Sequence, residues 1–264
     1  MKILIIGGDK RYLTLSNKLK QQYDITHIKS EEELQKIDIK QYKIIIFPIS
    51  GVSKENTVIS LNNSIKLNKE TFQNISPNTI IYSGIVNQNL INLVPENHII
   101  SFLADEDVKR ENNILTVDGI LDKIRQENVS TICILGFGNI GKLLYQKLLE
   151  ENKTVIVGVK EEKDLLYLKE KAFYTTYENM TIFLNQVDYI VNTVPENIIK
   201  ISQIINPNIK ILDVASFPHG INIQEAKTLQ NYTKYLGIPA KRSPKEAGKI
   251  LYKKLKKDLK GENL

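Results

Sequence analysis

Apolar residues along this chain fall into two patterns, short unbroken runs and longer stretches with helical spacing. The short runs are rich in Ile and Val and predict buried strands, whereas the amphipathic stretches predict helices. In the first half the predicted strands are Lys2–Ile6, Asp24–Ile28, Lys43–Phe47, Thr79–Tyr82 and His98–Ser101, and the predicted helices include Arg11–Gln21 and Gln88–Leu93. In the second half the predicted strands are Val129–Leu135, Thr154–Val159, Tyr189–Asn192, Ile209–Val214 and Thr233–Leu236.

This alternation predicts an α/β fold, because strands that alternate with helices form parallel sheets with helical crossovers. We expect two doubly wound parallel-sheet domains, residues 1–115 and 116–240, of which the second is a Rossmann dinucleotide-binding domain. A helix over Thr116–Gln126 joins the halves, and residues 58–67 predict a β-hairpin. The last segment, 241–264, predicts a helix that packs back on the first domain. We expect a substrate to meet a cofactor in the groove between the domains.

Composition narrows the classes of function. Hydrophobic residues make up 42% and charged residues 25% of the 264 residues, which is ordinary for a soluble globular protein. No apolar run approaches the ~20 residues of a membrane span, and the first residues lead into a strand rather than a signal-peptide cleavage region. The single cysteine, Cys133, lies in a predicted strand and is expected to be a small core residue. Together these features predict a cytoplasmic protein in a reducing compartment.

The net charge of +6 is concentrated at the end of the chain. Residues 241–264 contain nine Lys and Arg and three Asp and Glu, so the other residues sum to zero. Ile250, Leu251, Leu255 and Leu259 recur at helical spacing, which indicates an amphipathic helix with a solvated lysine face rather than a nucleic-acid interface. Three scattered histidines and one cysteine form no metal-ligand spacing.

The most informative motif follows the predicted strand 129–135, where G-x-G-x-x-G precedes an amphipathic run. The first glycine permits the tight turn, the second lets a pyrophosphate approach the backbone, and the third lets the helix pack closely on the strand. The alternative is that this segment is an ordinary glycine-rich turn between a strand and a helix and binds no cofactor. The expected cofactor-binding residues are Gly136, Phe137, Gly138, Asn139, Ile140 and Gly141.

Lys160 directly follows the second strand of this domain, where an NAD site usually has an acidic residue for the ribose 2′-hydroxyl. A lysine at this place would attract a 2′-phosphate, so we favour NADP as the cofactor. The alternative is that Lys160 is a solvated loop residue and that NAD binds equally well.

Two further segments follow strands of the same domain and are expected to face the cofactor. Small and polar residues at the carboxyl ends of strands lie on the side where open α/β sheets bind ligands. The residues concerned are Thr193, Val194, Pro195, Ala215 and Ser216.

In the first domain, Gly7-Gly8-Asp9-Lys10-Arg11 follows the first strand but lacks the third glycine. We expect Arg11, with nearby backbone amides, to hold a carboxylate. The alternative is that Asp9 caps the helix and Arg11 is solvated. Ser50, Ser83 and Gly84 also lie at or directly after predicted strand ends and would offer hydroxyls and amides to the same site.

With these motifs in place, the chain resembles a known family, the A subunit of dipicolinate synthase. The resemblance rests on segments in family order over nearly the whole chain: GGDKR (7–11), FPIS (47–50), YSGI (82–85), TVDG (116–119), LGFGNIG (135–141), NTVP (192–195), DVASFPHG (213–220) and LGIPAKRSPKEAGKIL (236–251). Phe217 stands where the family usually has Arg, His219 where it usually has Gly, and Asp118 where Glu is commoner.

The resemblance implies oxidation of dihydrodipicolinate, or its hydrated precursor, to dipicolinate, with a nicotinamide nucleotide as hydride acceptor. It also implies a flavoprotein-like partner, the B subunit of dipicolinate synthase, and a role in sporulation in the mother-cell cytoplasm. We further expect a homo-oligomer.

A cyclic substrate with two carboxylates needs two cationic or amide-rich pockets. We expect Arg11 with the Gly8 and Asp9 amides at one carboxylate, and Ser83, Gly84 or Ser216 with Lys245 at the other, with Ser50 and Thr116 as further contacts.

The candidate bases are Asp9, Asp118 and His219, and the alternative for His219 is an ordinary loop histidine. His27 and His98 lie on predicted strands and are expected to be structural.

Two other functions stay open. A two-domain 2-hydroxy-acid dehydrogenase would need an arginine and a histidine–carboxylate pair that Phe217 and His219 do not reproduce. A non-catalytic nucleotide-binding protein that serves as a scaffold for a partner would need only the glycine motif.

Overall fold

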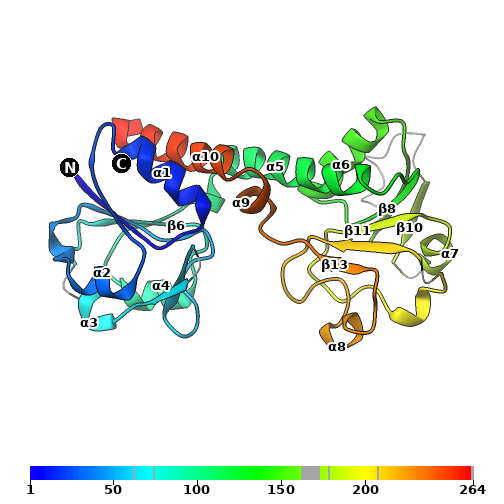
Figure 1. The fold of residues 1–264 in the computed structure, drawn as a ribbon, viewed down its shortest axis with the longest axis horizontal. Helices are drawn as coiled ribbons and strands as arrows, with labels where there is room; N and C mark the ends of the chain where they lie inside the picture. Colours follow the sequence, from blue (N-terminus) through cyan, green and yellow to red (C-terminus); the bar gives the residue numbers. More distant parts are fainter. Residues whose placement is uncertain (62, 74, 162–172, 178, 207, 263–264) are drawn as a thin grey trace. The chain divides into compact units, whose positions relative to one another are not determined.

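The computed structural model describes residues 1–61, 63–73, 75–161, 173–177, 179–206 and 208–262 (Figure 1). The chain divides into two compact units, and each has its own parallel sheet. The first unit comprises Met1–Asn112 together with Pro239–Leu264, and the second comprises Asn113–Ile238. The predicted fold class, two parallel-sheet α/β domains, is confirmed.

The first unit has a five-stranded parallel sheet in the order β2-β1-β3-β6-β7, which is a doubly wound order. Its strands are β1 (Lys2–Ile6), β2 (Asp24–Ile28), β3 (Ile44–Ile46), β6 (Ile80–Ser83) and β7 (Ile99–Ser101). Its short helices are α1 (Lys10–Leu19), α2 (Glu31–Gln35), α3 (Lys69–Phe72) and α4 (Gln88–Leu93). A separate antiparallel hairpin consists of β4 (Thr57–Ser60) and β5 (Asn63–Lys66). The central strands are buried on both faces, which explains their continuous Ile runs.

Helix α5 (Glu106–Arg125) begins in the first unit and ends in the second. The apolar spacing predicted a start at Thr116, and this is wrong by ten residues. The carboxylate of Asp105 accepts a hydrogen bond from the Val108 amide at 3.0 Å, and two acidic residues follow in the first turn. Capping and the helix dipole therefore begin this helix where no apolar stripe marks it.

The chain returns to the first unit through α9 (Ile238–Arg242) and α10 (Pro244–Lys257). Figure 1 shows α10 beside α1, and a Cβ on Gly248 would lie 2.4 Å from the Arg11 carbonyl oxygen. Lys18 lies over the Tyr252 ring, so the two helices run in the same direction. Close packing of this kind requires a glycine at the contact.

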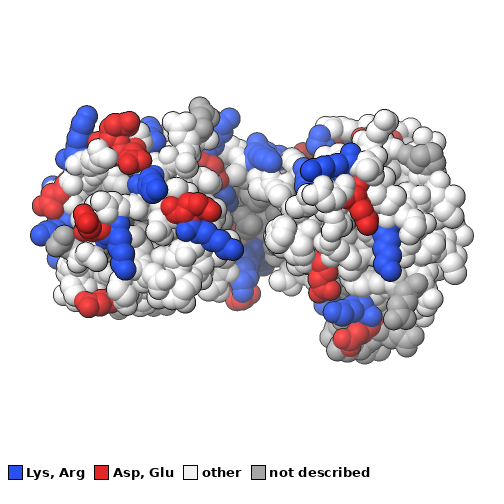
Figure 2. Space-filling model, turned by 90° about the horizontal axis from the view of Figure 1, so that it is seen from below, with Lys and Arg blue, Asp and Glu red and all other residues white. Residues whose placement is uncertain are grey.

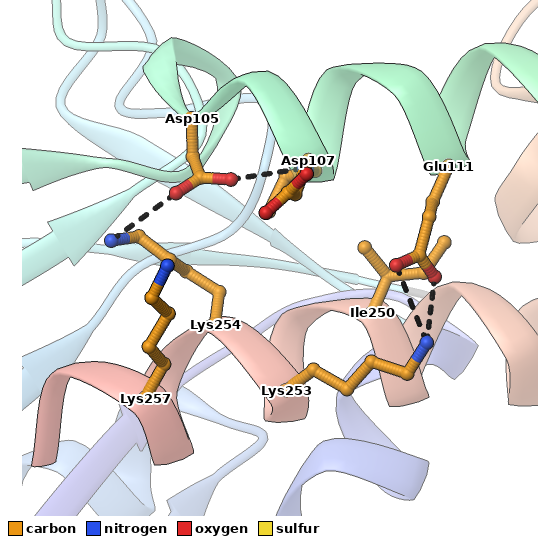
Figure 3. A pocket seen from close by; sticks show the side chains of 8 residues that line it. Asp105, Asp107, Glu111, Ile250, Lys253, Lys254 and Lys257 are labelled. Atoms are coloured by element: carbon orange, nitrogen blue, oxygen red, sulfur yellow. Dashed lines mark hydrogen bonds and ion pairs between the residues drawn. The ribbon is translucent and has the colours of Figure 1, made fainter. Parts of the chain in front are cut away.

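A pocket lies between α5 and α10 and is lined by charged side chains of both signs (Figure 3). Lys253 pairs with Glu111 at 2.9 Å, and Lys254 pairs with Asp105 at 3.4 Å. Lys254 also reaches the buried carboxylate of Asp258 at 2.7 Å, which accepts a hydrogen bond from Tyr82 Oη at 2.8 Å. Burial and the adjacent Asp258 raise the pKa of Tyr82. Lys253 and Lys254 of α10 therefore bind carboxylates of other segments in the first unit and help to hold this helix in place.

The second unit has a six-stranded parallel sheet in the order β10-β9-β8-β11-β12-β13. Counted from β8, this is the order 3-2-1-4-5-6 of dinucleotide-binding domains. Its strands are β8 (Thr131–Leu135), β9 (Thr154–Val159), β10 (Phe173–Thr176), β11 (Tyr189–Asn192), β12 (Lys210–Asp213) and β13 (Tyr232–Lys234). Its helices are α6 (Asn139–Glu150), α7 (Thr181–Leu184) and α8 (Ile223–Ala226). Burial raises the pKa of the Cys133 thiol to about 12, as expected for an inert core residue.

Surface charges of opposite sign lie close to one another. Figure 2 shows Lys and Arg side chains next to Asp and Glu on the drawn face of each unit. Exposed pairs of this kind contribute little to stability individually.

Candidate functional site: the open turn after β8

The topological switch point of the second sheet lies between β8 and β11, the two strands from which the order runs in opposite directions. In open parallel sheets, ligands bind at the carboxyl ends of the strands beside this point. Gly136 follows β8 there, and Thr193 follows β11. The Thr193 hydroxyl donates to the Leu135 carbonyl oxygen at 2.8 Å and so ties the two strand ends together.

The three glycines of the turn meet different surroundings. Gly136 has φ +95°, and a Cβ there would lie 2.5 Å from Thr193 Oγ1. A Cβ on Gly141 would lie 2.1 Å from the Gly136 carbonyl oxygen. A Cβ on Gly138 would meet no atom within 4 Å. Two glycines are therefore required by packing, whereas the third leaves space over the backbone that a pyrophosphate can fill.

The N-terminus of α6 has no side-chain cap in the described part of the chain. Gly138 and Asn139 are exposed, and the first intrahelical bond of the turn is donated by Lys142 to the Gly138 carbonyl oxygen at 2.9 Å. The preceding amides of the helix have no intrahelical acceptor, and the helix dipole makes this end attractive to an anion. Phe137 packs edge-on against Tyr145, with ring centroids 5.7 Å apart, while Ile140 is half-buried. These residues fit a dinucleotide.

Lys160, at the end of β9, is exposed and pairs with Glu196 at 3.7 Å. Glu196 follows Pro195 in the segment after β11, so this segment and the end of β9 approach each other. Pro195 is exposed and Val194 is half-buried, with its side chain close to Gly136. Residues 162–172 lie outside the described residues. The ion pair is solvated and weak, so it leaves Lys160 available to an anionic ligand.

A buried polar network connects the ends of β11 and β12. The fully buried Asp213 carboxylate accepts hydrogen bonds from Asn192 Nδ2 at 3.0 Å and Tyr232 Oη at 2.6 Å. It also accepts the backbone amides of Ala215 at 3.1 Å and Gly220 at 2.7 Å. Burial and Asp213 together raise the pKa of Tyr232. The network fixes both ends of the loop 215–220.

Three residues of this loop were predicted to belong to the site, and their environments differ. Ala215 is buried, Ser216 is exposed, and His219 is buried with its Nδ1 2.8 Å from the Ala215 carbonyl oxygen. His219 has φ +72°, a left-handed backbone conformation that favours glycine. Phe217 is 74% exposed, an unusual state for a large aromatic ring.

The glycine turn of the first unit is closed. Asp9 caps α1 by accepting the Arg11 amide at 3.0 Å, and Arg11 Nη2 donates to Asp9 Oδ2 at 2.6 Å. Arg11 is buried rather than solvated. Burial acts to lower the pKa of Arg11, but the hydrogen bond and charge of Asp9 outweigh it and raise that pKa. The alternative interpretation of this turn is therefore half right. Asp9 does cap the helix, but Arg11 is buried rather than solvated.

The hairpin β4–β5 covers the same turn. The Gly8 amide, expected to be free for a carboxylate, donates instead to the Ile59 carbonyl oxygen at 2.7 Å. The fully buried Ser83 hydroxyl donates to the Ile85 carbonyl oxygen at 2.9 Å. A Cβ on Gly84 would lie 2.3 Å from the Ile49 carbonyl oxygen, so this glycine serves close backbone packing. Ser50 is exposed.

The remaining predicted residues lie on helices. Lys245 is exposed in the first turn of α10, and because α10 runs parallel to α1, it lies at the same end as Asp9 and Arg11. Thr116 is buried and Asp118 is half-buried on α5, in the part that belongs to the second unit. The structure therefore groups Asp9, Arg11 and Lys245 in one unit, and the turn, Lys160 and His219 in the other.

Sequence reasoning missed the residues that organise the loop 215–220. Asp213, Asn192 and Tyr232 form its network, and Asn197 Nδ2 donates to the His219 carbonyl oxygen at 3.0 Å. One feature of the sequence could have indicated this network. Asn192 and Asp213 are polar, and each is the last residue of a buried strand; the two strands are adjacent in the sheet.

Two models of known protein families match this chain, one in each half of the sequence. Residues 2–102 match the model of the N-terminal domain of the dipicolinate synthase A subunit. Residues 127–258 match the model of the acetohydroxy acid isomeroreductase NADPH-binding domain. The second half of the chain is thus an NAD(P)-binding domain.

Relatives match over nearly the whole chain. The A subunit of dipicolinate synthase from Bacillus subtilis (strain 168) is 27% identical, covering 97% of this chain and 95% of the relative. The crystal structure of the dipicolinate synthase A subunit from Bacillus halodurans superposes with a TM-score of 0.85 at 24% identity, covering 98% of this chain and 97% of that chain. NAD-dependent formate dehydrogenase from Staphylococcus aureus, in complex with NAD, shares the fold at a TM-score of 0.56 and 11% identity, covering 98% and 95% of the two chains.

These comparisons support an oxidoreductase-type role with a nicotinamide dinucleotide. Within the described ranges, no helix combines the length and apolar character needed to cross a bilayer. The same residues contain no group of three His, Cys, Asp or Glu side chains arranged to hold a metal ion.

Proposed function

Because the chain belongs to the dipicolinate synthase A-subunit family, we propose that it oxidises dihydrodipicolinate, or the hydrated precursor of that ring, to dipicolinate with NADP. The observation that carries this proposal is the open turn at Gly138, with an uncapped helix behind it. Such a turn binds a dinucleotide pyrophosphate through backbone amides. When bound, the nicotinamide accepts the hydride that leaves the substrate ring.

The residues of the protein would bind the substrate and the nucleotide and orient them toward each other. Formation of an aromatic ring supplies much of the driving force, so positioning the reactants accounts for a large share of the rate. The residues proposed to hold the dinucleotide are Gly136, Phe137, Gly138, Asn139, Ile140, Gly141, Thr193, Val194, Pro195, Ala215 and Ser216.

We assign the preference for NADP to Lys160. Its ammonium group is exposed at the end of β9, and its partner Glu196 is exposed as well. A 2′-phosphate would compete with Glu196 for this cation, and a doubly charged phosphate is the stronger partner.

The dicarboxylate is proposed to be held by cations of the first unit. Arg11 presents its Nε and Nη2 to Asp9, so a substrate carboxylate would have to bind its remaining edge or share it with Asp9. Lys245 is exposed at the same end of the parallel helices and supplies a second cation. Ser50 and Ser216 are exposed hydroxyls, whereas Ser83, Gly84 and Thr116 would act by shaping the backbone.

The partner and the location are proposed from the family. We propose that the flavoprotein-like B subunit of dipicolinate synthase joins this chain in a complex, that the chain forms a homo-oligomer, and that the complex acts during sporulation in the mother-cell cytoplasm. Co-purification of the two proteins after co-expression, followed by measurement of the mass of the complex in solution, tests the first two points.

The direct test of the activity is a spectrophotometric assay. Purified protein, with and without its proposed flavoprotein-like partner, is mixed with freshly made dihydrodipicolinate and either NADP or NAD, and the absorbance of the reduced nicotinamide is followed. Turnover with NADP and release of dipicolinate are expected. Nucleotide binding without turnover, even with the partner present, would instead indicate a scaffolding role, and turnover of 2-hydroxy acids would indicate the other dehydrogenase class.

A further inference from the structure

His219 has a left-handed backbone conformation, which is uncommon for a residue with a Cβ. Its φ of +72° lies in the left-handed region, where a residue with a Cβ is strained. His219 is only 6% exposed, although it lies in a loop that follows the carboxyl end of β12. Residues in such sparsely populated backbone conformations cluster at active sites and ligand-binding loops.

The surrounding contacts hold the backbone of His219 from several directions. Its amide donates to the Ser216 carbonyl oxygen at 2.9 Å, and its carbonyl oxygen accepts from Asn197 Nδ2 at 3.0 Å. Asp213 binds the amides of Ala215 and Gly220, one at each end of the loop. These hydrogen bonds fix the loop on both sides of His219 and hold its backbone in the left-handed conformation.

The hydrogen bond of the ring determines where its proton resides. Nδ1 lies 2.8 Å from the Ala215 carbonyl oxygen. A carbonyl oxygen accepts and cannot donate, so Nδ1 carries the hydrogen. In the neutral ring Nε2 then holds the lone pair, and within the described part of the chain Nε2 has no hydrogen-bond partner. The ring is therefore prepared to accept a proton at Nε2.

The other candidate bases are less suited to this task. Both oxygens of Asp9 accept hydrogen bonds from Arg11, at 2.9 Å and 2.6 Å for the shortest contacts. Both carboxylate oxygens are therefore engaged by the guanidinium, so a ring proton would have to compete with Arg11 for them. Asp118 lies on α5 and is only half-buried, with a partner of its own.

We infer that His219 is the proton acceptor of the ring oxidation. The inference rests on the proposed function. Dihydrodipicolinate loses one ring hydrogen with its electron pair, as hydride, to the nicotinamide. It loses a second as a proton to His219 Nε2, and the electrons of that C–H bond complete the aromatic ring. The products are dipicolinate, reduced nucleotide and one proton, which the imidazolium releases to water.

Two substitutions distinguish loss of the proton acceptor from loss of the loop conformation. His219→Asn tolerates the left-handed conformation, and its amide can donate to the Ala215 carbonyl oxygen, so the loop is kept while the base is removed. His219→Gly fits the backbone without strain and leaves room for a free imidazole. The exposed His98, remote in sequence from this loop, provides the matched control His98→Gln.

The expected result is a fall in kcat of about 10²–10⁴-fold in both His219 variants, with the dissociation constant for NADP within about threefold of wild type. Added imidazoles should restore turnover of His219→Gly but not of His219→Asn, and the restored rate should rise with the basicity of the imidazole. A restored rate independent of basicity, or His219→Asn with more than a third of the wild-type kcat, would overturn the inference.

A readout without turnover completes the test. Nitrogen-15 NMR of the histidine rings, assigned by comparison with His219→Asn, should show that the neutral His219 ring carries its hydrogen on Nδ1 and not on Nε2. The opposite tautomer would refute the assignment. An inactive wild-type complex with either nucleotide would refute the proposed function, whereas an active wild type with an active His219→Asn would refute only the role of His219.

Discussion

The two units each contain a glycine-rich turn between their first strand and the helix that follows it, and the two turns differ in which residues cover them. After β1, Asp9 caps the helix, and the hairpin strand β4 accepts the Gly8 amide. A Cβ on Gly8 would lie 2.3 Å from the Tyr12 ring. After β8 no side chain in the described part of the chain caps the helix, and the space over Gly138 is open.

The difference shows that glycine content alone does not identify an anion site. In the first turn the Asp9 carboxylate already occupies the positive end of the helix and is itself neutralised by Arg11. In the second turn no side chain in the described part of the chain caps the helix, so the equivalent amides can donate to an anion. A single residue at the N-cap, aspartate in one turn and glycine in the other, therefore distinguishes a turn that its own side chain closes from one that stays open.

The largest effect is expected from opening the closed turn. Asp9→Ala removes the cap of α1 and leaves the buried Arg11 guanidinium without its carboxylate, and this should lower the free energy of unfolding by about 3 kcal/mol. Urea denaturation followed by circular dichroism measures the loss. Asp9→Asn, which keeps a capping oxygen but no charge, should lie between wild type and Asp9→Ala. A loss below about 1 kcal/mol in Asp9→Ala would show that this turn is not held by Asp9.

The converse change closes the open turn. Gly138→Asp places a carboxylate at the N-cap of α6, where it would repel the pyrophosphate, so affinity for NADP and NAD should fall at least about 100-fold. Stability should stay the same or rise by about 1 kcal/mol, because the helix gains a cap. Isothermal titration calorimetry measures the affinity, and a change of less than threefold would argue against nucleotide binding at this turn.

A third change tests packing within the open turn. A Cβ on Gly141 would lie 2.1 Å from the Gly136 carbonyl oxygen, so Gly141→Ala should cost about 2 kcal/mol of stability through overpacking. Gly138→Ala is the matched control and should stay within about 1 kcal/mol of wild type, since nothing lies within 4 Å of its Cβ. Equal melting temperatures for the two variants would contradict the different roles assigned to these glycines.

The smallest effect concerns the choice between nucleotides. Lys160→Glu should weaken NADP binding about tenfold, or about 1.4 kcal/mol, and leave NAD binding unchanged or improved. Glu196→Gln removes the competing carboxylate and should keep or raise the affinity for NADP. Unchanged NADP affinity in Lys160→Glu would remove this lysine from the cofactor site.

Strands buried on both faces were predictable from local pattern. The predicted bounds of β1, β9 and β11 agree with the structure to the residue, and so do those of β2, an edge strand that is only partly buried. Continuous Ile and Val runs have no polar face to confuse their assignment. The edge strand β10 was missed, because Phe173 and Tyr174 are exposed and its four residues show no buried run.

The amino-acid sequence by itself determined the two parallel sheets and the turn at 136–141, because hydrophobic periodicity and glycine spacing are local properties of a chain. Only the tertiary structure decided which turn is open and which side chains are free. The Gly8 amide donates to the Ile59 carbonyl oxygen, which is distant in sequence, and the Ser83 hydroxyl is fully buried and donates to the Ile85 carbonyl oxygen. Hydrogen bonds and close contacts between remote segments, such as Gly8 with Ile59 or Asn192 with Asp213, exist only once the strands have been placed side by side.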